Sequence, residues 1–284
     1  MSLTNLLKKL LIEYKIKPRK RFGQSFLVDE NLMKRMINYA NLKEDDVVLD
    51  IGAGFGFLTE LLAEKVKKVI AIEIDPKLVK FLRKKFAHTN RVEIFQGDFL
   101  KLSFKGYYNK VVSSPPYTRI SDILFKLLRE NFEVAVLLLQ KEFALRLTAK
   151  PGEESYGRLT VMTYVQAEVE LLDEVLSSAF YPQPEVSSML VRIKPKKEPP
   201  FKIHDWNMFE ETVRFLFTQK NRKLRNALQT FSKQESFKWL SKPFEGIPYL
   251  EKRVFTLKPE EICEISNIIY TQKNRNIKFS EVNS

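Results

Sequence analysis

Short apolar runs alternate with amphipathic segments over the middle of the chain. The runs are VVLDI (47–51), KVIAIEI (68–74), RVEIF (91–95), KVVSS (110–114) and EVAVLLL (133–139), each rich in Val, Ile or Leu. Apolar residues at helical spacing fill 57–66, 76–87 and 120–130 between them. Strands without polar alternation are typical of a parallel sheet that is covered on both faces. The pattern therefore predicts a doubly wound α/β fold.

The remainder of the chain divides at KPKKEPP (194–200), a Pro- and Lys-rich stretch that is typical of a linker. Before the linker, extended stretches at 160–172 and 187–193 are expected to complete the sheet as an antiparallel hairpin. After it, WNMFEETVRFLF and KLRNALQTF have a helical pattern, and a last helix opens at Lys258-Pro259-Glu260-Glu261. We expect an α/β domain over residues 1–194 and a small all-helical domain over residues 201–284.

Positive charge is concentrated in three segments of the chain. The formal net charge is +13, and Lys and Arg gather in residues 1–22, in residues 192–202 and between residues 220 and 225. Clustered positive charge favours a polyanionic partner, such as nucleic acid or an acidic membrane surface, and we expect nucleic acid. The candidate backbone contacts are Lys17, Arg19 and Arg21 in the N-terminal arm, with Arg222 and Arg225, three residues apart, on one helix face in the second domain.

The scarcity of some residue types excludes several classes of site. The single cysteine, Cys263, allows neither an internal disulfide nor a Cys-based metal centre, and the two histidines lie far apart in the sequence. No apolar run approaches the ~20 residues that cross a bilayer, and charged residues interrupt the N-terminal apolar segment, unlike a signal peptide. We expect a monomeric cytoplasmic protein that has no metal site and no membrane partner.

A glycine-rich turn, DIGAGFGF at residues 50–57, joins the first predicted strand to a helix. Its glycines allow the backbone to turn tightly and to approach a ligand without a clash from Cβ. The spacing is G-x-G-x-G, whereas a dinucleotide fingerprint requires a glycine at Phe57. This departure argues against NAD and favours S-adenosylmethionine, with Gly52 and Gly54 at the ligand.

Acidic residues follow at the ends of the next two predicted strands. Glu73 closes the second strand, where a carboxylate accepts ribose hydroxyls. Asp98 follows the third strand, where an acid accepts the adenine amino group of the cofactor, although a lone Asp at such a position more often caps a helix. Because the carboxyl ends of parallel strands meet at one edge of the sheet, we expect these residues in one cofactor site.

The loop VVSSPPY at residues 111–117 has the Ser/Asn/Asp-Pro-Pro-aromatic pattern of amino-directed methyltransferases. An adenine amine is a weak nucleophile because its lone pair is delocalised into the ring. Acceptors aimed at its hydrogens favour the nucleophilic form as the transition state develops. We expect the Ser114 hydroxyl and the Pro115 carbonyl to be these acceptors and Tyr117 to stack on the base. A rigid turn with a surface Tyr is the alternative.

Four longer motifs resemble the small-subunit ribosomal RNA adenine dimethyltransferases of KsgA type, and the archaeal members more than the bacterial ones. RKRFGQSFLVD (19–29) is similar to the family's N-terminal motif, which closes over the cofactor, and QKEFALRLTAKPGEESYGRLTV (140–161) to its QKE…YGRL signature. AFYPQPEVSSMLVRIKP (179–195) is similar to its F-x-P-x-P-x-V-x-S segment, and TQKNRKLRNAL (218–228) to the basic helix of its second domain. The resemblance covers nearly the whole chain.

The resemblance implies a Rossmann-like methyltransferase sheet that uses S-adenosylmethionine. It implies dimethylation of two adjacent adenines in the 3′-terminal hairpin of small-subunit ribosomal RNA, on an immature subunit during its biogenesis. The implied adenine contacts are Ser114 and Tyr117. The implied cofactor contacts are Gln24, Ser25, Leu27, Gly52, Glu73, Asp98 and Ser114.

Two positions depart from the family, and two other interpretations stay open. The family usually has Asn-Leu-Pro-Tyr where this chain has SPPY, and Asn or His is common at the position of Ser25. SPPY is also compatible with methylation of DNA adenine or protein glutamine. DNA enzymes of this kind normally carry a separate target-recognition segment, and the short helical pattern after the linker disfavours that interpretation. A non-catalytic ribosome-assembly factor is supported by the unusual Ser114, whereas Gly52 and Glu73 argue against it.

Overall fold

The computed structural model describes residues 2–18, 24–233, 237, 244 and 246–282, which form two compact units. The first unit comprises Met1–Ala144 and Ala167–Pro195, and the second comprises Leu145–Gln166 and Lys196–Ser284. The boundary expected near residue 194 lies beside the end of the first unit. The contacts also place residues 145–166 in the second unit, and nothing in the sequence pattern indicated this assignment.

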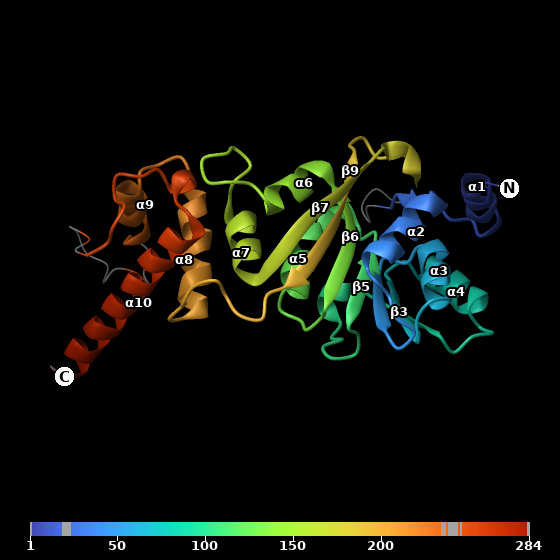
Figure 1. The fold of residues 1–284 in the computed structure, drawn as a ribbon, viewed down its shortest axis with the longest axis horizontal. Coiled ribbons are helices and arrows are strands. Elements are labelled where there is room, and N and C mark those ends of the chain that lie inside the picture. The colour runs from blue at the N-terminus through green and yellow to red at the C-terminus, as the bar shows by residue number, and fades with distance from the viewer. Residues whose placement is uncertain (1, 19–23, 234–236, 238–243, 245, 283–284) are drawn as a thin grey trace. The chain divides into compact units, whose positions relative to one another are not determined.

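A seven-stranded sheet forms the centre of the first unit (Figure 1), in the order β4-β3-β2-β5-β6-β9-β7. The five strands from β4 to β6 pair in parallel, and β9 pairs antiparallel with both β6 and β7. The five apolar runs are thus confirmed as parallel strands, each within one residue at either end. Their bounds are β2 Val47–Ile51, β3 Lys68–Glu73, β4 Val92–Gln96, β5 Lys110–Ser113, β6 Val134–Gln140, β7 Ala167–Val175 and β9 Ser188–Pro195.

The expected extended stretch at 160–172 is wrong over its first half. Residues Arg158–Gln166 form helix α7, and the strand β7 begins only at Ala167. The segment RLTVMTYVQ is rich in β-branched residues, which favour strands. It buries side chains on most sides in the helical unit, including Val161, Met162 and Val165. Packing therefore overrides the local preference.

Helices cover both faces of the sheet. Helices α2 (Glu30–Tyr39), α3 (Phe57–Ala63) and α4 (Pro76–Lys85) share one apolar cluster with alternate strand residues such as Val48 and Val112. The residues between them, such as Leu49 and Val111, are also buried. Because strand order reverses between β4 and β5, right-handed crossovers place α5 (Ile120–Leu127) on the opposite face. Helix α6 (Lys141–Leu147) follows β6. The doubly wound fold is confirmed.

The reversal of strand order fixes where a ligand has room. The chain runs outward from β2 through β3 to β4 and then returns to β5 on the other side of β2. In open α/β sheets ligands bind outside the carboxyl ends of the strands at such a switch point. The turn after β2 and the loop after β5 therefore lie next to each other.

A second, two-stranded sheet joins the beginning of the first unit to its last hairpin. Strand β1 (Phe26–Leu27) pairs antiparallel with β8 (Phe180–Tyr181). Helix α1 (Leu3–Glu13) precedes it. Short 3₁₀ turns complete the unit: η2 (Phe99–Lys101), η3 (Tyr117–Arg119) and η4 (Ser177–Ala179).

The second unit is helical in the part of the chain that the structure describes, as the sequence predicts for its later segment. It contains α7, α8 (Trp206–Thr218), α9 (Leu224–Phe231), the 3₁₀ turn η6 (Val254–Thr256) and α10 (Pro259–Val282). Phe231 stacks on Phe215 and on Phe237 in its core, with ring centroids 4.2 and 3.8 Å apart. One expectation fails here, because α9 begins only after Lys223 and Arg222 therefore does not lie on its face.

Candidate functional site

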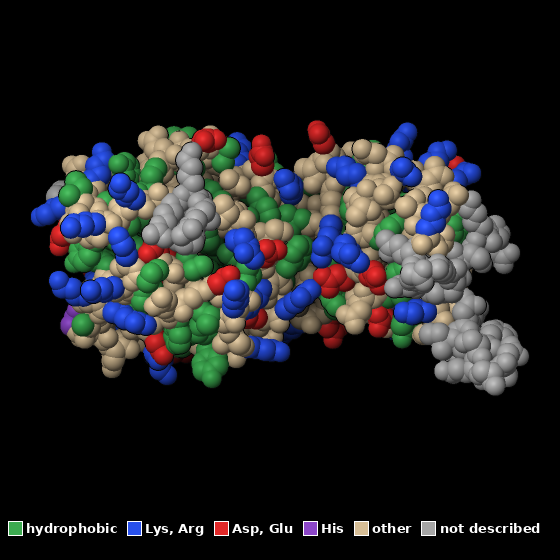
Figure 2. Space-filling model, turned by 180° about the vertical axis from the view of Figure 1, so that it is seen from behind, with side chains coloured by type: hydrophobic (Ala, Val, Ile, Leu, Met, Phe, Trp, Pro, Cys, Tyr) green, Lys and Arg blue, Asp and Glu red, His purple; other side chains and the backbone are tan. Residues whose placement is uncertain are grey.

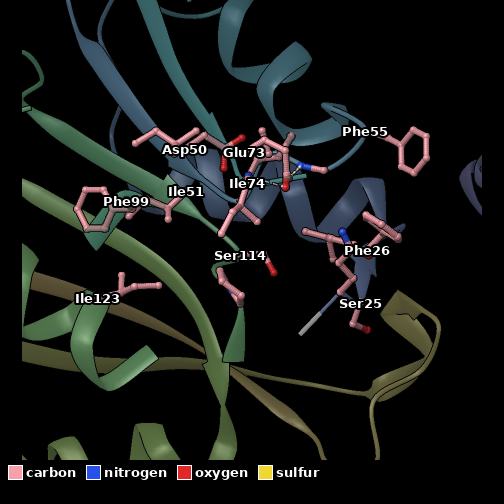
Figure 3. Close-up of a pocket in the computed structure, with 18 of the residues that line it drawn as sticks. Ser25, Phe26, Asp50, Ile51, Phe55, Glu73, Ile74, Phe99, Ser114 and Ile123 are labelled. Carbon is pink, nitrogen blue, oxygen red and sulfur yellow. Dashed lines mark hydrogen bonds between the residues drawn. The ribbon is translucent and has the colours of Figure 1, made fainter. Parts of the chain in front are cut away.

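A cavity of about 310 Å³ opens at the carboxyl ends of the parallel strands, at the switch point of the sheet (Figure 3). In the close-up, Phe99 and Ile123 lie on one side, Ser25 and Phe26 lie on the other, and Ser114 lies between them. All the residues that the sequence predicts at the cofactor line this one cavity: Gln24, Ser25, Leu27, Gly52, Gly54, Glu73, Asp98 and Ser114.

The glycine turn needs residues without a Cβ atom, both for its backbone conformation and for the close approach of its neighbours. Gly52 and Gly54 have φ of +83° and +58°, a region that side chains with a Cβ rarely adopt. A Cβ on Gly54 would lie 3.0 Å from Cδ1 of Phe26, and one on Gly52 would lie 3.3 Å from Cδ of Pro116. The turn therefore allows both the N-terminal segment and the loop after β5 to close on the cavity.

Glu73, at the end of β3, is nearly inaccessible to solvent and is held by backbone donors. Its Oε1 accepts the N–H groups of Ile74 and Asp75 over 2.8 and 2.9 Å, and its Oε2 accepts that of Gly54 over 2.9 Å. Burial raises the pKa of Glu73, and these hydrogen bonds oppose the rise. Oε2 keeps a lone pair for one further donor in the cavity.

Asp50, which opens the glycine motif and was not predicted as a site residue, also lines the cavity. It is fully buried, and the Thr59 hydroxyl donates to its Oδ2 over 2.7 Å. Burial raises the pKa of Asp50 to about 7, and the charge of neighbouring Glu73 acts in the same direction. Two buried carboxyl groups at one wall favour a ligand that carries positive charge.

Asp98 caps a 3₁₀ turn and also lies at the cavity, which are the two positions that the sequence left open. It caps η2, since its Oδ1 accepts the N–H of Leu100 over 3.0 Å, and it also lines the cavity. The ring of Phe99 and the half-exposed side chain of Ile74 add apolar walls beside it. A carboxylate between flat apolar walls suits a planar, amine-bearing ring.

Lys126, on α5, holds the 3₁₀ turn η2, which carries the Phe99 wall of the cavity. Its ammonium donates to the carbonyl of Phe99 over 2.6 Å and to the carbonyl of Leu102, and it lies 4.5 Å from the centroid of the Phe99 ring. These contacts join three neighbouring parts of one wall to a single side chain. No sequence pattern predicts this role, because Lys126 and Phe99 are separated along the chain by β5 and most of α5.

The N-terminal segment closes the opposite side of the cavity through contacts to distant residues. Gln24 Nε2 donates to Oδ2 of Asp75 over 3.3 Å. The Ser25 hydroxyl donates to the carbonyl of Pro182 over 2.5 Å, beside the pairing of β1 with β8. The hydroxyl of Ser25 is therefore engaged with the protein itself.

The loop after β5 presents one unengaged hydroxyl at the cavity. The neighbouring Ser113 is buried, and its hydroxyl accepts from the N–H of Ile51 over 3.0 Å and donates to the Ile51 carbonyl over 2.7 Å. Ser114 lines the cavity, and its hydroxyl has no hydrogen-bond partner among the described residues. Pro116 lines the cavity as well, whereas Pro115 is buried and is not part of the lining.

Tyr117 lies next to the cavity rather than in its lining. Its hydroxyl hydrogen-bonds the hydroxyl of buried Ser188 over 2.6 Å, and its ring packs edge-to-face on Phe180 at a centroid distance of 6.3 Å. Burial raises the pKa of Tyr117 to about 12, so the side chain stays neutral at physiological pH. It is therefore an oriented aromatic ring and not a base.

The five predicted RNA contacts have different surroundings. Lys17 is exposed, and Arg19 and Arg21 lie outside the described residues. In the second unit Arg222 is exposed, and its side chain has no ion-pair partner among the described residues. Arg225 forms an ion pair with Glu251, as does Lys223.

Two other kinds of site are absent from the part of the chain that the structure describes. Among the described residues, no group of three or more His, Cys, Asp or Glu side chains is arranged to hold a metal ion. Within the same residues, no helix has both the length and the apolar character needed to cross a membrane.

Comparison with known proteins places the chain among RNA-modifying enzymes. The family model "Ribosomal RNA adenine dimethylase" matches residues 15–271. A probable ribosomal RNA small subunit methyltransferase A of Methanosarcina acetivorans is 39% identical over 272 residues, which are 95% of this chain and 100% of the relative.

Two solved structures share the architecture. A dimethyladenosine transferase from Plasmodium falciparum superposes with a TM-score of 0.76 at 27% identity, over 87% of this chain and 98% of the other. The 23S rRNA methyltransferase ErmE superposes with a TM-score of 0.65 at 28% identity, over 86% and 99%.

Proposed function

Because the chain belongs to the ribosomal RNA adenine dimethylase family, we propose that it dimethylates the exocyclic amines of two adjacent adenines in the 3′-terminal hairpin of small-subunit ribosomal RNA, with S-adenosylmethionine as the methyl donor. One observation carries the proposal. A single cavity combines the acidic wall of Asp50 and Glu73 with the unengaged hydroxyl of Ser114. The first is suited to a cationic nucleoside, and the second to an amine.

The residues of the cavity fit this cofactor. S-adenosylmethionine supplies an electrophilic methyl group on a positively charged sulfonium. Buried Asp50 and Glu73 balance that charge, and the free lone pair of Glu73 Oε2 accepts a ribose hydroxyl. Asp98 accepts from the adenine amine between Ile74 and Phe99. The remaining contacts come from Gln24, Ser25, Leu27, Gly52, Gly54 and Ser114.

The target adenine enters beside Ser114 after it has left its helix, because a stacked base cannot reach a pocket of this kind. The Ser114 hydroxyl and the Pro115 carbonyl accept from the amine, which raises its nucleophilicity as the transition state forms. Tyr117, held by Ser188 and Phe180, stacks on the base. The methylated amine carries a proton that is acidic enough to leave for solvent, so no strong base is needed.

Positively charged side chains bring the RNA to this site. Figure 2 shows Lys and Arg spread over one face of the molecule, with Asp and Glu among them. We assign the chemistry to the α/β domain, residues 1–194, and further RNA contacts to the helical domain, residues 201–284. The contacts are Lys17, Arg19, Arg21, Arg222 and Arg225. The protein acts as a monomer in the cytoplasm on immature small ribosomal subunits.

The test is transfer of labelled methyl groups from S-adenosylmethionine to small ribosomal subunits that lack the 3′-hairpin methylation. Digestion and separation of labelled nucleosides should give dimethyladenosine at two adjacent positions. Large ribosomal subunits serve as the control substrate, because a protein of similar fold, ErmE, is a 23S rRNA methyltransferase. The Ser114→Ala variant should transfer little label even when the cofactor is saturating. Transfer to large subunits, or no transfer by a protein that binds the cofactor, would overturn the proposal.

A further inference from the structure

Helix α4 presents a row of positive side chains to solvent. Its sequence PKLVKFLRKK contains no acidic residue, and Lys77, Lys80, Arg83 and Lys84 are exposed. Among the described residues none of these four forms an ion pair with a carboxylate. Lys85, the fifth cation, differs because it pairs with Glu60 over 2.9 Å.

The N-terminal segment adds its own cations to the same surface. The Lys77 ammonium donates to the carbonyl of Lys15 over 2.9 Å, and the ring of Tyr14 packs edge-to-face on Phe81 of α4 at 4.9 Å. These contacts seat the end of α1 on α4, and the two helices lie at the same end of the first unit (Figure 1). Exposed Lys15 and Lys17 thereby continue the row of α4.

Each end of this surface is connected by side-chain contacts either to the cavity or to the loop after β5. At the beginning of α4, the capping residue Asp75 accepts from Gln24, which lines the cavity. On α1, Lys8 lies 5.2 Å from the ring centroid of Tyr181, whose neighbour Phe180 packs on Tyr117. The positive surface of α1 and α4 thus borders both halves of the site.

The stability of the helix does not account for this row of charges. Lys77, Lys80 and Lys84 are three and four residues apart, where like charges on a helix repel one another. Cations at the C-terminal end of a helix interact favourably with its dipole, and this accounts for Arg83 and Lys84 in the last turn. Lys77 lies in the first turn, where the dipole opposes it, and Lys80 lies in the middle of the helix, where the dipole gives no benefit. A polyanion along the row would compensate these repulsions.

We propose that the exposed cations of α4, together with Lys15 and Lys17 after α1, form one continuous contact for an RNA backbone. This contact holds the strand that flanks the target adenine. The identity of the RNA rests on the proposed function, whereas the contact itself is electrostatic and independent of sequence. Lys17, expected from the sequence to bind RNA, is one end of a surface whose larger part lies about sixty residues further along the chain.

The test compares two triple variants that each remove three positive charges from the first unit. Lys80→Gln, Arg83→Gln and Lys84→Gln remove the row on α4. Lys43→Gln, Lys65→Gln and Lys67→Gln remove three exposed lysines near the amino ends of β2 and β3, remote from the cavity. All six side chains are solvent-exposed, so equal cofactor affinity and melting temperature should confirm that both variants fold.

Affinity for a 3′-hairpin fragment of small-subunit ribosomal RNA, and for a homopolymeric RNA of the same length, is measured over a range of salt concentrations. Each phosphate contact contributes about 0.7–0.9 to the slope of log affinity against log salt. The α4 variant should therefore lower that slope by about 2 with both RNAs, and the control variant should leave it unchanged. Each single α4 substitution should lower it by about a third as much.

Two results overturn the inference: an unchanged slope in the α4 variant, or the same reduction in both triple variants, which would reflect net charge alone. The homopolymer separates this inference from the proposed function. If wild-type protein methylates no ribosomal RNA, the proposed function fails, while a slope that depends on α4 with the homopolymer still supports the contact.

Discussion

The backbone N–H of Gly54 donates to Oε2 of Glu73 over 2.9 Å, so the turn after β2 and the carboxylate at the end of β3 form one wall of the cavity. The same carboxylate holds the beginning of the next loop through the N–H groups of Ile74 and Asp75. Glu73 therefore shapes the cavity as well as facing it, which gives its substitution two measurable consequences.

The Glu73→Gln variant should bind S-adenosylmethionine at least about tenfold more weakly. The amide has one acceptor oxygen in place of two, and a hydrogen bond to a charged group contributes about 1.5–3 kcal/mol. The variant should also unfold at a lower temperature. Calorimetric titration and thermal unfolding measure the two effects. Glu93→Gln on neighbouring β4 is the control, because Glu93 only forms an exposed ion pair with Lys68. Equal affinities of the two variants would contradict the assignment.

Cofactor affinity should depend on pH through Asp50. Because burial raises the pKa of Asp50 to about 7, the group is protonated below that pH and charged above it. A sulfonium cation stabilises the charged form. Affinity for S-adenosylmethionine should therefore rise as the pH increases toward about 7, by at most about tenfold per pH unit, and level off above that pH.

S-adenosylhomocysteine lacks the sulfonium charge and should show a weaker dependence when both ligands are titrated calorimetrically. Glu73 also has a raised pKa, so the Asp50→Asn variant is needed to separate the two groups. If the variant keeps the full pH dependence of the wild type, Asp50 is not its source.

Ser188→Ala should lower kcat about 2- to 10-fold, the size of one net hydrogen bond, and leave cofactor affinity unchanged. The substitution removes the partner of the Tyr117 hydroxyl and allows the ring to leave its orientation. Tyr117→Phe removes the same hydrogen bond from the other side. The double variant should therefore be no slower than the slower single variant, which a double-mutant cycle of methyl-transfer rates measures.

The control for this cycle is Ser187→Ala, at the residue immediately before β9. The Ser187 side chain forms no hydrogen bond with the described residues, so none is lost. Multiplicative losses in the double variant would show that Ser188 and Tyr117 act independently.

Lys126→Met should weaken cofactor binding several-fold with little change in kcat at saturating cofactor. The ammonium supports the carbonyls of Phe99 and Leu102 and lies over the Phe99 ring, all at the apolar wall. Losing these contacts loosens η2 without touching the loop after β5. Lys101→Met, an exposed lysine on η2 itself, is the matched control. A similar loss of affinity in both variants would point to a general effect of charge.

Gly54→Ala should destabilise the protein by more than Gly106→Ala does. Both glycines have positive φ, so each alanine carries a backbone cost of about 1–2 kcal/mol. Only at residue 54 does the added Cβ also meet Phe26, at 3.0 Å, whereas nothing lies within 4 Å at residue 106. Denaturant unfolding measures the difference, and cofactor affinity should fall in Gly54→Ala alone. Equal destabilisation would mean that the Phe26 side chain moves away from the added Cβ at no cost in stability.

Much of the fold and of the cavity lining could be predicted because both follow from local pattern and strand order. Continuous apolar runs located the parallel strands, and residues at the carboxyl ends of such strands necessarily converge. For this reason the sequence alone predicts that Gly52, Glu73, Asp98 and Ser114 lie together. Residues 160–166 show the limit of local pattern, because their β-branched side chains favour a strand while their packing in the second unit makes them helical.

Local periodicity and chain order were thus enough to predict the doubly wound sheet, the position of its ligand cavity and the residues at its strand ends, since all three follow from neighbours along the chain. The distant partners that hold those residues follow from packing instead: Ser188 for Tyr117, Pro182 for Ser25, and α4 for the N-terminal arm. Burial of Asp50 likewise raises its pKa to about 7. Such contacts depend on how separate elements pack in three dimensions, and no spacing along the chain records them.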